Sequence, residues 1–233
     1  MGHRRAAARG QHRADGAAGV PVKRATVRPT LLLTGFDPFD GAKSNPSWDA
    51  ASALDGRIVG GHRIVARQLP TEFDASLRAL RAAIRETAPS LVVCLGLAGG
   101  RKELSLERVA INIDDARIPD NAGAQPVDAK IAARGPAAYF STLPIKAMLA
   151  ALRKHGIPAQ VSQTAGTYVC NHVFYGLMHA LRNKRDVRGG FIHVPNAGRG
   201  GMPLEDIAEG LRIALRVAAT TNEDARIAAG AED

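Results

Sequence analysis

Hydrophobic and polar positions along the chain alternate between two spacings, which predicts strands alternating with helices. Short apolar runs are typical of buried strands and occur at 30–35 (TLLLTG), 62–70 (HRIVARQLP), 90–96 (SLVVCLG), 108–113 (RVAINI), 159–164 (AQVSQT) and 189–195 (GGFIHVP). Amphipathic helical spacing occurs at 74–86, 144–156, 171–184 and 202–219. The alternation favours an α/β domain with a largely parallel sheet covered on both faces.

The same pattern sets the expected domain boundaries. We expect a basic, low-complexity, disordered extension over 1–28, one α/β domain over 29–219 and a frayed tail over 220–233. Within the domain the periodicity is weak between Pro119 and Pro144. An irregular stretch of this length is typical of a functional loop.

Four chemically suggestive features follow or close predicted strands. GFDPF (35–39) follows the first strand, GLAGG (96–100) follows SLVVCLG, Cys170 comes after AQVSQT, and His193 closes GGFIH. In open α/β sheets, ligands bind outside the carboxyl ends of the strands. The sequence therefore predicts a site at that edge of the sheet.

Charge narrows the possible partners. The formal net charge is +9, but residues 1–30 carry +6, leaving +3 for the other 203 residues. With six Phe, three Tyr and one Trp there are few aromatic rings for base stacking, so we expect no nucleic-acid function.

No apolar run reaches the roughly 18 residues of a membrane span. Two cysteines form no disulfide framework, which favours a cytoplasmic protein.

Cys170 stands where a loop becomes a helix, in AGTYVCNHVFY (165–175). Backbone N–H groups and the helix dipole stabilise an anion there, so we expect a lowered thiol pKa and a reactive thiolate. A free cysteine is more commonly a small buried apolar residue. Position favours that alternative for Cys94, inside a predicted strand, and catalysis for Cys170.

A thiol nucleophile needs a base, and the base needs a carboxylate that orients it. Among seven histidines, His193 ends an apolar strand directly after the Cys170 helix, so these elements should be neighbours. His172 and His179 share a helix face and are expected to be solvated or capping residues. Spacing along the sequence does not decide which carboxylate orients the histidine. Glu107 directly precedes an apolar strand, so its side chain is the one most readily buried. The candidates are Glu103, Glu107, Asp114 and Asp115.

Other chemical templates are missing from the sequence. It contains no GxxxxGK[ST], no HExxH and no CxxC, and its glycine-rich GLAGGR and NAGRGG lack nucleotide-binding spacing. We therefore expect neither a metal nor a cofactor.

Three long blocks resemble the pyroglutamyl peptidase I (pyrrolidone-carboxylate peptidase) family. They are LLLTGFDPFDGAKSNPSW (31–48), GLAGGRKELSLERVAINIDDARIPDN (96–121) and SQTAGTYVCNHVFY (162–175), supported by GGFIHVP. The resemblance implies a cysteine peptidase that removes N-terminal pyroglutamyl residues from peptides. It also implies a three-layer α/β/α sandwich with a central twisted sheet, assembled as a homotetramer.

Residue roles follow from the resemblance. Cys170 would be the nucleophile, His193 the general base and Glu107 the residue that orients the histidine. The implied substrate-binding residues, including backbone oxyanion donors and an arginine near the reaction centre, are Phe36, Phe39, Asn45, Leu97, Val169 and Arg117. Leu97 departs from the family, in which many members carry Gln at this position. Aromatic faces and backbone hydrogen bonds suit a small neutral lactam.

Two other functions stay open at this point. One is a catalytically silent relative that binds small ligands or peptide ends on the same scaffold. The other is a nucleic-acid-associated protein that acts through the basic extension.

Overall fold

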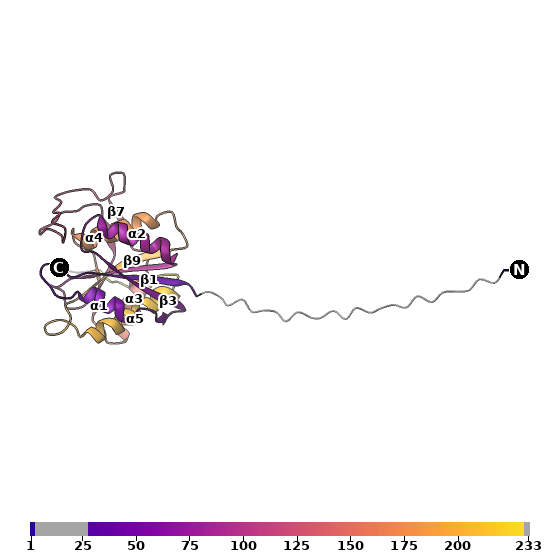
Figure 1. The fold of residues 1–233 in the computed structure, drawn as a ribbon. Helices are drawn as coiled ribbons and strands as arrows, with labels where there is room; N and C mark the ends of the chain where they lie inside the picture. The colour runs from indigo at the N-terminus through magenta and orange to yellow at the C-terminus, as the bar shows by residue number, and fades with distance from the viewer. Residues whose placement is uncertain (3–27, 231–233) are drawn as a thin grey trace.

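The computed structural model describes residues 1–2 and 28–230. The predicted extension over 1–28 lies outside the described residues except at its two ends, and so do the last three residues of the predicted tail. What the structure describes from Thr30 onward is a mixed α/β arrangement (Figure 1).

A seven-stranded sheet forms the middle layer. Its order is β2-β3-β1-β4-β9-β5-β8. The strands are β1 (Thr30–Phe36), β2 (Ile58–Val59), β3 (His62–Leu69), β4 (Leu91–Leu97), β5 (Leu104–Glu107), β8 (Ala159–Ser162) and β9 (Arg188–Val194). Strands β3, β1, β4 and β9 are parallel to one another. Strand β5 runs antiparallel to β9, and β8 pairs parallel with β5.

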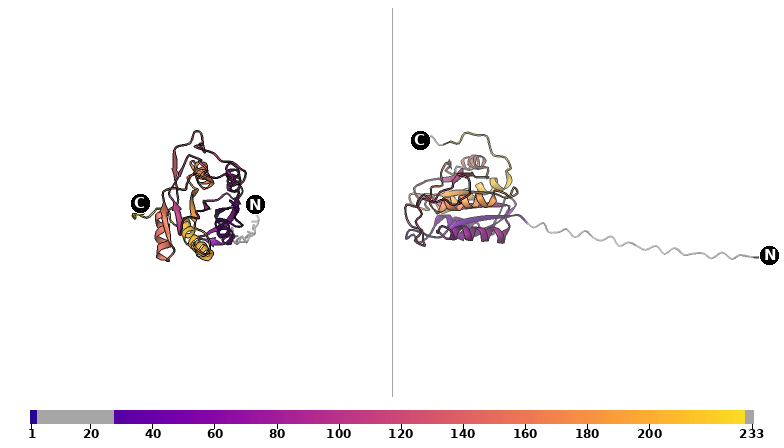
Figure 2. Two further views of the ribbon diagram at one scale, coloured as in Figure 1. Left: turned by 90° about the vertical axis from the view of Figure 1, so that its left-hand side faces the viewer. Right: turned by 90° about the horizontal axis from the view of Figure 1, so that it is seen from above.

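Helices cover both faces of the sheet (Figure 1). One face carries α2 (Ala75–Thr87) and α4 (Val169–Leu181); the other carries α1 (Pro46–Ala53), α3 (Ile145–Lys154) and α5 (Leu204–Thr220). Helices α3 and α5 lie side by side (Figure 2). Each face has its own buried apolar cluster, because strand side chains point alternately to the two sides. The predicted α/β/α sandwich with a largely parallel sheet is confirmed.

Some elements were not predicted. The short strand β5 was not among the predicted strands; it ends at Glu107, so this residue closes one strand and precedes the predicted apolar strand, here β6. The stretch from Pro119 to Pro144 is irregular except for β7 (Ala138–Phe140), which pairs with β6 (Val109–Ile111) in a separate antiparallel sheet. Asn171 on α4 holds this sheet through hydrogen bonds with the N–H and C=O of Ile111.

The direction of β8 changes one premise of the sequence interpretation. Because β8 runs against β9, Cys170 does not follow a strand end at the edge that carries Leu97 and Val194. The loop 163–168 and the start of α4 bring the thiol to that edge instead.

The C-terminal tail differs from the expected frayed segment over residues 221–230. Oδ1 of Asp224 accepts a hydrogen bond from Ala147 N at 2.8 Å, and Oδ2 accepts one from Lys146 N at 3.2 Å. Ala229 packs against the apolar cluster on the α3 face.

Over the described ranges, no helix combines the length and apolar character needed to cross a bilayer.

Candidate active site

Cys170 is the second residue of α4, one position inside the helix start. Tyr168 forms the N-cap and provides no side-chain cap within the part of the chain described, so the first-turn N–H groups are not satisfied by a capping side chain. Gly166 adopts a φ of +76°, which lets the chain turn sharply before the helix. A helix start of this kind presents N–H donors toward a negative charge.

Gly96 on β4 provides the space for the thiol. A Cβ built at Gly96 would lie 2.7 Å from Sγ of Cys170 and 2.8 Å from Cζ of Phe191. Gly96 is the register partner of His193 on β9, so both positions face the same side of the sheet. The imidazole of His193 therefore lies on the side of the sheet where the sulfur sits, one strand away.

His193 is buried and bonded to Glu107. Its Nδ1–H donates to Oε1 of Glu107 at 2.8 Å, and the Glu107 side chain is fully buried. Because Nδ1 is the donor to the carboxylate, Nε2 carries the free lone pair and can accept a proton. Of the four carboxylates that spacing left open, the structure brings Glu107 to His193.

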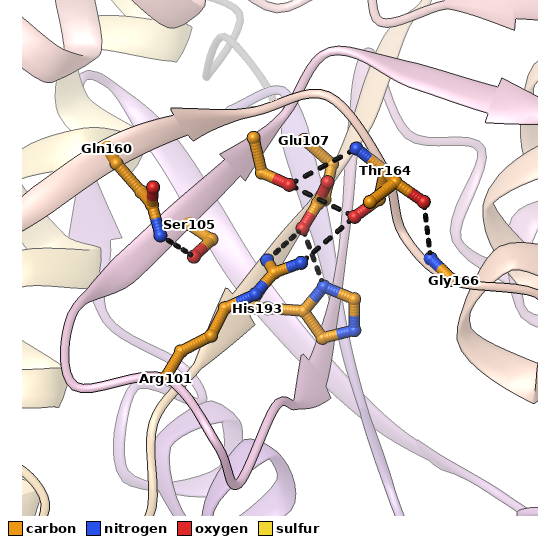
Figure 3. Close-up of polar contacts among 8 residues, drawn as sticks. Arg101, Ser105, Glu107, Gln160, Thr164, Gly166 and His193 are labelled. Atoms are coloured by element: carbon orange, nitrogen blue, oxygen red, sulfur yellow. Dashed lines mark hydrogen bonds and ion pairs between the residues drawn. The ribbon is translucent and has the colours of Figure 1, made fainter. Parts of the chain in front are cut away.

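Arg101 was not singled out from the sequence, yet it reaches the same carboxylate. Its Nη1 donates to Oε1 of Glu107 at 2.6 Å, and its Nη2 donates to the carbonyl oxygen of Thr164 at 3.0 Å (Figure 3). The signal was present, because Arg101 directly follows the GLAGG motif. Nothing in the spacing, however, indicated that its side chain would turn back toward Glu107.

The resting charge of the thiol differs from the expectation. Burial raises the pKa of Cys170 to about 12; the negative charge of Glu107 adds to this, while the positive charge of Arg101 opposes it. The expected lowering of the pKa is therefore wrong for the free site, because desolvation of the thiolate is the largest effect. At neutral pH the resting sulfur is a thiol, and it needs a base at the moment of attack.

A small, mostly apolar cavity opens beside the thiol. It is lined by Phe36, Phe39, Asn45, Thr71, Leu97, Tyr168, Val169 and Cys170. The set includes five of the six predicted binding residues. Thr71 and Tyr168 were missed; Tyr168 stands two positions before Cys170, and only the tertiary structure turns its ring into the wall.

The GFDPF loop that forms one wall is held by Asn45. Its Nδ2 donates to the carbonyl oxygen of Asp37 at 2.9 Å, and its Oδ1 accepts hydrogen bonds from the N–H and hydroxyl of Ser47. Asn45 is also the N-cap of α1. Its polar atoms are thus occupied within the protein, and it supports the cavity wall.

Arg117 is the predicted residue that the structure does not bring to the thiol cavity. It is exposed and lines a neighbouring cavity with Asp115 and Thr167. The two cavities share Phe39 and Tyr168, whose rings stand 6.4 Å apart.

Two further histidines correct the sequence interpretation. His172 is buried, and its Nδ1–H donates to Oδ2 of Asp114 at 2.7 Å. His179 is half-buried, with its Nδ1 2.8 Å from the hydroxyl of Tyr139. Neither is a solvated or capping residue. Their partners lie 58 and 40 positions away in the sequence, so helical spacing alone could not reveal them.

A buried imidazole held by a carboxylate, beside a thiol at a helix start, defines a class of cysteine hydrolase. The family model described as pyroglutamyl peptidase matches residues 29–221. The chain belongs to this family.

Similar proteins agree over most of the chain. The pyrrolidone-carboxylate peptidase of Cupriavidus pinatubonensis is 55% identical over 207 residues, covering 84% of this chain and 96% of its own. That of Erwinia tasmaniensis is 54% identical over 209 residues, covering 86% and 98%. The crystal structure of pyroglutamyl peptidase I from Bacillus amyloliquefaciens superposes with a TM-score of 0.84 at 46% identity, covering 87% and 100%.

Proposed function

We propose that this protein is a cysteine peptidase that removes N-terminal pyroglutamyl residues from peptides, with Cys170, His193 and Glu107 as its catalytic residues. The observation that carries the proposal is the position of Sγ of Cys170 over Gly96, next to a histidine whose other nitrogen is bonded to a buried carboxylate. Family membership supplies the substrate class.

The first half of the reaction forms an acyl-enzyme. Nε2 of His193 accepts the thiol proton as Sγ of Cys170 forms a bond to the pyroglutamyl carbonyl carbon. First-turn N–H groups at Val169 and Cys170 stabilise the oxyanion. The tetrahedral intermediate then collapses, the C–N bond breaks, and His193 gives its proton to the leaving amine. Because the free thiol has a raised pKa, proton transfer to His193 accompanies attack.

The second half regenerates the thiol. Water attacks the thioester while His193 accepts a proton from it, and the C–S bond breaks to release pyroglutamate. His193 then returns the proton to the sulfur. Throughout, Glu107 holds Nδ1–H and stabilises the imidazolium form.

The cavity suits the substrate end. An N-terminal pyroglutamyl residue is a neutral five-membered lactam, so it offers no charge for a charged side chain to bind. Phe36, Phe39 and Tyr168 provide aromatic faces. Leu97 contributes an apolar side chain where many family members carry Gln, so we propose that any polar contact from this position uses its backbone.

A chromogenic pyroglutamyl amide tests the proposal. We expect turnover of this substrate and none of the open-chain glutaminyl amide, which has a free amine. Cys170→Ala should lower kcat/KM by at least about 10⁴-fold. Cys94→Ala is the matched control: its side chain is fully buried and does not line the cavity beside Cys170, so activity should persist. Turnover retained in Cys170→Ala, or equal cleavage of both amides, would refute the assignment.

We also propose a homotetramer in a reducing, cytoplasmic environment. Both cysteines are free thiols, and a nucleophilic thiol must stay reduced. Phe140, on the edge strand β7, exposes 69% of its surface, as expected for a residue available to another subunit.

A further inference from the structure

We propose that Arg101 is a positioning residue that keeps Glu107 charged while His193 is neutral, and that ties this carboxylate to the loop leading into Cys170. The inference rests on the proposed function, because it assigns Arg101 a part in preparing His193 to act as the base. It concerns a residue that contacts neither the bound lactam nor the reacting atoms in the mechanism above.

The geometry places one guanidinium between two parts of the site. Arg101 comes from the turn after β4, where its N–H donates to the carbonyl oxygen of Ala98. Its Nη1 bonds the carboxylate of Glu107 on β5, and its Nη2 bonds the carbonyl of Thr164 in the loop before α4 (Figure 3). A planar guanidinium can satisfy both acceptors at once, whereas an ammonium offers no such fixed fork.

The loop is well defined at the point where Arg101 joins it. The Thr164 carbonyl also accepts a hydrogen bond from the Ser162 hydroxyl at 3.0 Å. The Thr164 hydroxyl accepts one from Gly166 N at 3.0 Å (Figure 3). Arg101 therefore anchors a braced turn six residues before the nucleophile. Displacing that turn would move the start of α4 relative to the His193–Glu107 pair.

Charge gives Arg101 its second role. Glu107 is fully buried, and its Oε2 finds no hydrogen-bond partner among residues 28–230. A buried carboxylate needs a compensating positive charge. In the described part of the chain its ion-pair partners are Arg101 and His193. If Arg101 were absent, an imidazolium at His193 would have to supply the charge, and an imidazolium cannot accept the thiol proton.

Few other groups can contribute charge here. In the described chain, the titratable groups that act on the Cys170 thiol are Glu107 from β5, Arg101 from the turn after β4 and Cys94 from β4, and Tyr168 from the loop before α4 lines the same cavity. Burial raises the pKa of both Cys94 and Tyr168 to about 12, so both are neutral at neutral pH. The local balance thus rests on one anion and one permanent cation.

Arg101→Gln removes the cation and should move the pH profile of kcat/KM. Loss of a nearby positive charge favours the protonated forms of the coupled thiol–imidazole pair, so both the acid and the alkaline limb should shift upward by about one pH unit. Arg101→Lys keeps the positive charge but loses the forked guanidinium geometry. In this variant the acid and alkaline limbs of the pH profile should stay in place, while kcat falls roughly tenfold. Arg67→Gln, which breaks the exposed Arg67–Glu86 pair, controls for a change in net charge and should leave the profile unchanged.

A second readout needs no substrate. The rate constant for alkylation of Cys170 by iodoacetamide, followed against pH by mass spectrometry, should show the same upward shift in Arg101→Gln. If the wild-type protein alkylates with a pH-dependent profile but does not cleave pyroglutamyl amides, the proposed function fails and this inference can still be judged.

The outcomes separate charge from structure. Unmoved limbs in a folded Arg101→Gln, with activity merely reduced, would overturn the charge role. Should Arg101→Gln fail to fold, as judged by circular dichroism, Arg101→Met replaces it. Should both fail, Arg101→Lys decides: a shifted profile, or an unchanged kcat, overturns the proposal.

Discussion

At the scale of single residues, the site depends on Gly96, because a glycine has no side chain to fill the space that the thiol needs. Sγ of Cys170 occupies the space above Gly96, and the ring of Phe191 closes the same space from β9. Phe191 is fully buried, so its ring cannot move aside without disturbing the core. The first glycine of GLAGG, Gly96, therefore allows α4 to approach β4 closely; it does not bind a phosphate.

Gly96→Ala tests this role directly. The new methyl group would overlap both Sγ of Cys170 and the Phe191 ring. Because Phe191 is fully buried, the thiol in the first turn of α4 should be displaced more easily than the ring. A shift of about 1 Å at a reacting atom costs on the order of 100-fold in kcat/KM. Gly100→Ala is the matched control, since a Cβ there meets nothing within 4 Å and its φ is not positive. Steady-state kinetics on the pyroglutamyl amide would contradict the idea if the two variants were equally active.

Residue identity alone anticipated part of the site. Cys170 stood out because a lone thiol preceded a helical pattern, and His193 because it ended an apolar strand. The raised pKa of Cys170 could not be anticipated, because it follows from burial and not from position on the helix. Nor could the role of Glu107 be fixed by spacing, since its partner His193 lies 86 positions away.

At the scale of elements, helix α3 receives its cap from a distant segment. Its N-cap residue, Pro144, has no capping side chain in the described structure, and the carboxylate of Asp224 accepts hydrogen bonds from the N–H groups of Lys146 and Ala147. A negative charge at a helix N-terminus is also favoured by the helix dipole. Composition predicted fraying of this polar tail because a cap supplied from 77 positions away leaves no local signal.

Asp224→Ala should therefore destabilise the protein without affecting catalysis. Loss of a capping carboxylate costs about 1 kcal/mol, which lowers the Tm of a domain of this size by about 2–4 °C. Helix α3 packs on the face opposite Cys170, so kcat and KM should not change. Glu223→Ala, one position earlier in the same exposed segment, removes the same charge and serves as the control. Equal melting temperatures for the two variants in scanning calorimetry would exclude the cap.

At the scale of the whole molecule, alternating apolar runs and amphipathic helices were enough to predict the layered fold. The strong signals came from strands such as β1 and β4, in which six of the seven residues are buried. The reversal at β5 and β8 left no signal, because apolar patterning records burial and not strand direction. Strand ends predicted that Cys170 and His193 meet at one edge of the sheet, and the structure places them together there. The predicted path to Cys170 was wrong, because β8 runs against β9.

Charge is also distributed unevenly over the molecule, and this permits a last test. Residues 2–27 carry a net charge of +5, more than half of the total of +9. The described fold needs the chain from Pro29 onward, since the Pro29 carbonyl accepts a hydrogen bond from Arg63 N at 2.9 Å. A variant lacking residues 2–27 should therefore keep the kcat/KM and the Tm of the full chain, and light scattering should give the same number of subunits for both, which we propose to be four.

The same variant separates the peptidase from the nucleic-acid alternative. Any binding of a labelled DNA duplex at low salt should belong to the basic segment, because the remaining chain is nearly balanced in charge. Deletion should then abolish that binding while peptidase activity stays intact. Salt-sensitive binding that survives the deletion would place a nucleic-acid surface on the folded domain. Loss of activity on deletion would instead mean that residues 2–27 take part in the site, and the proposed domain boundary at residue 29 would be wrong.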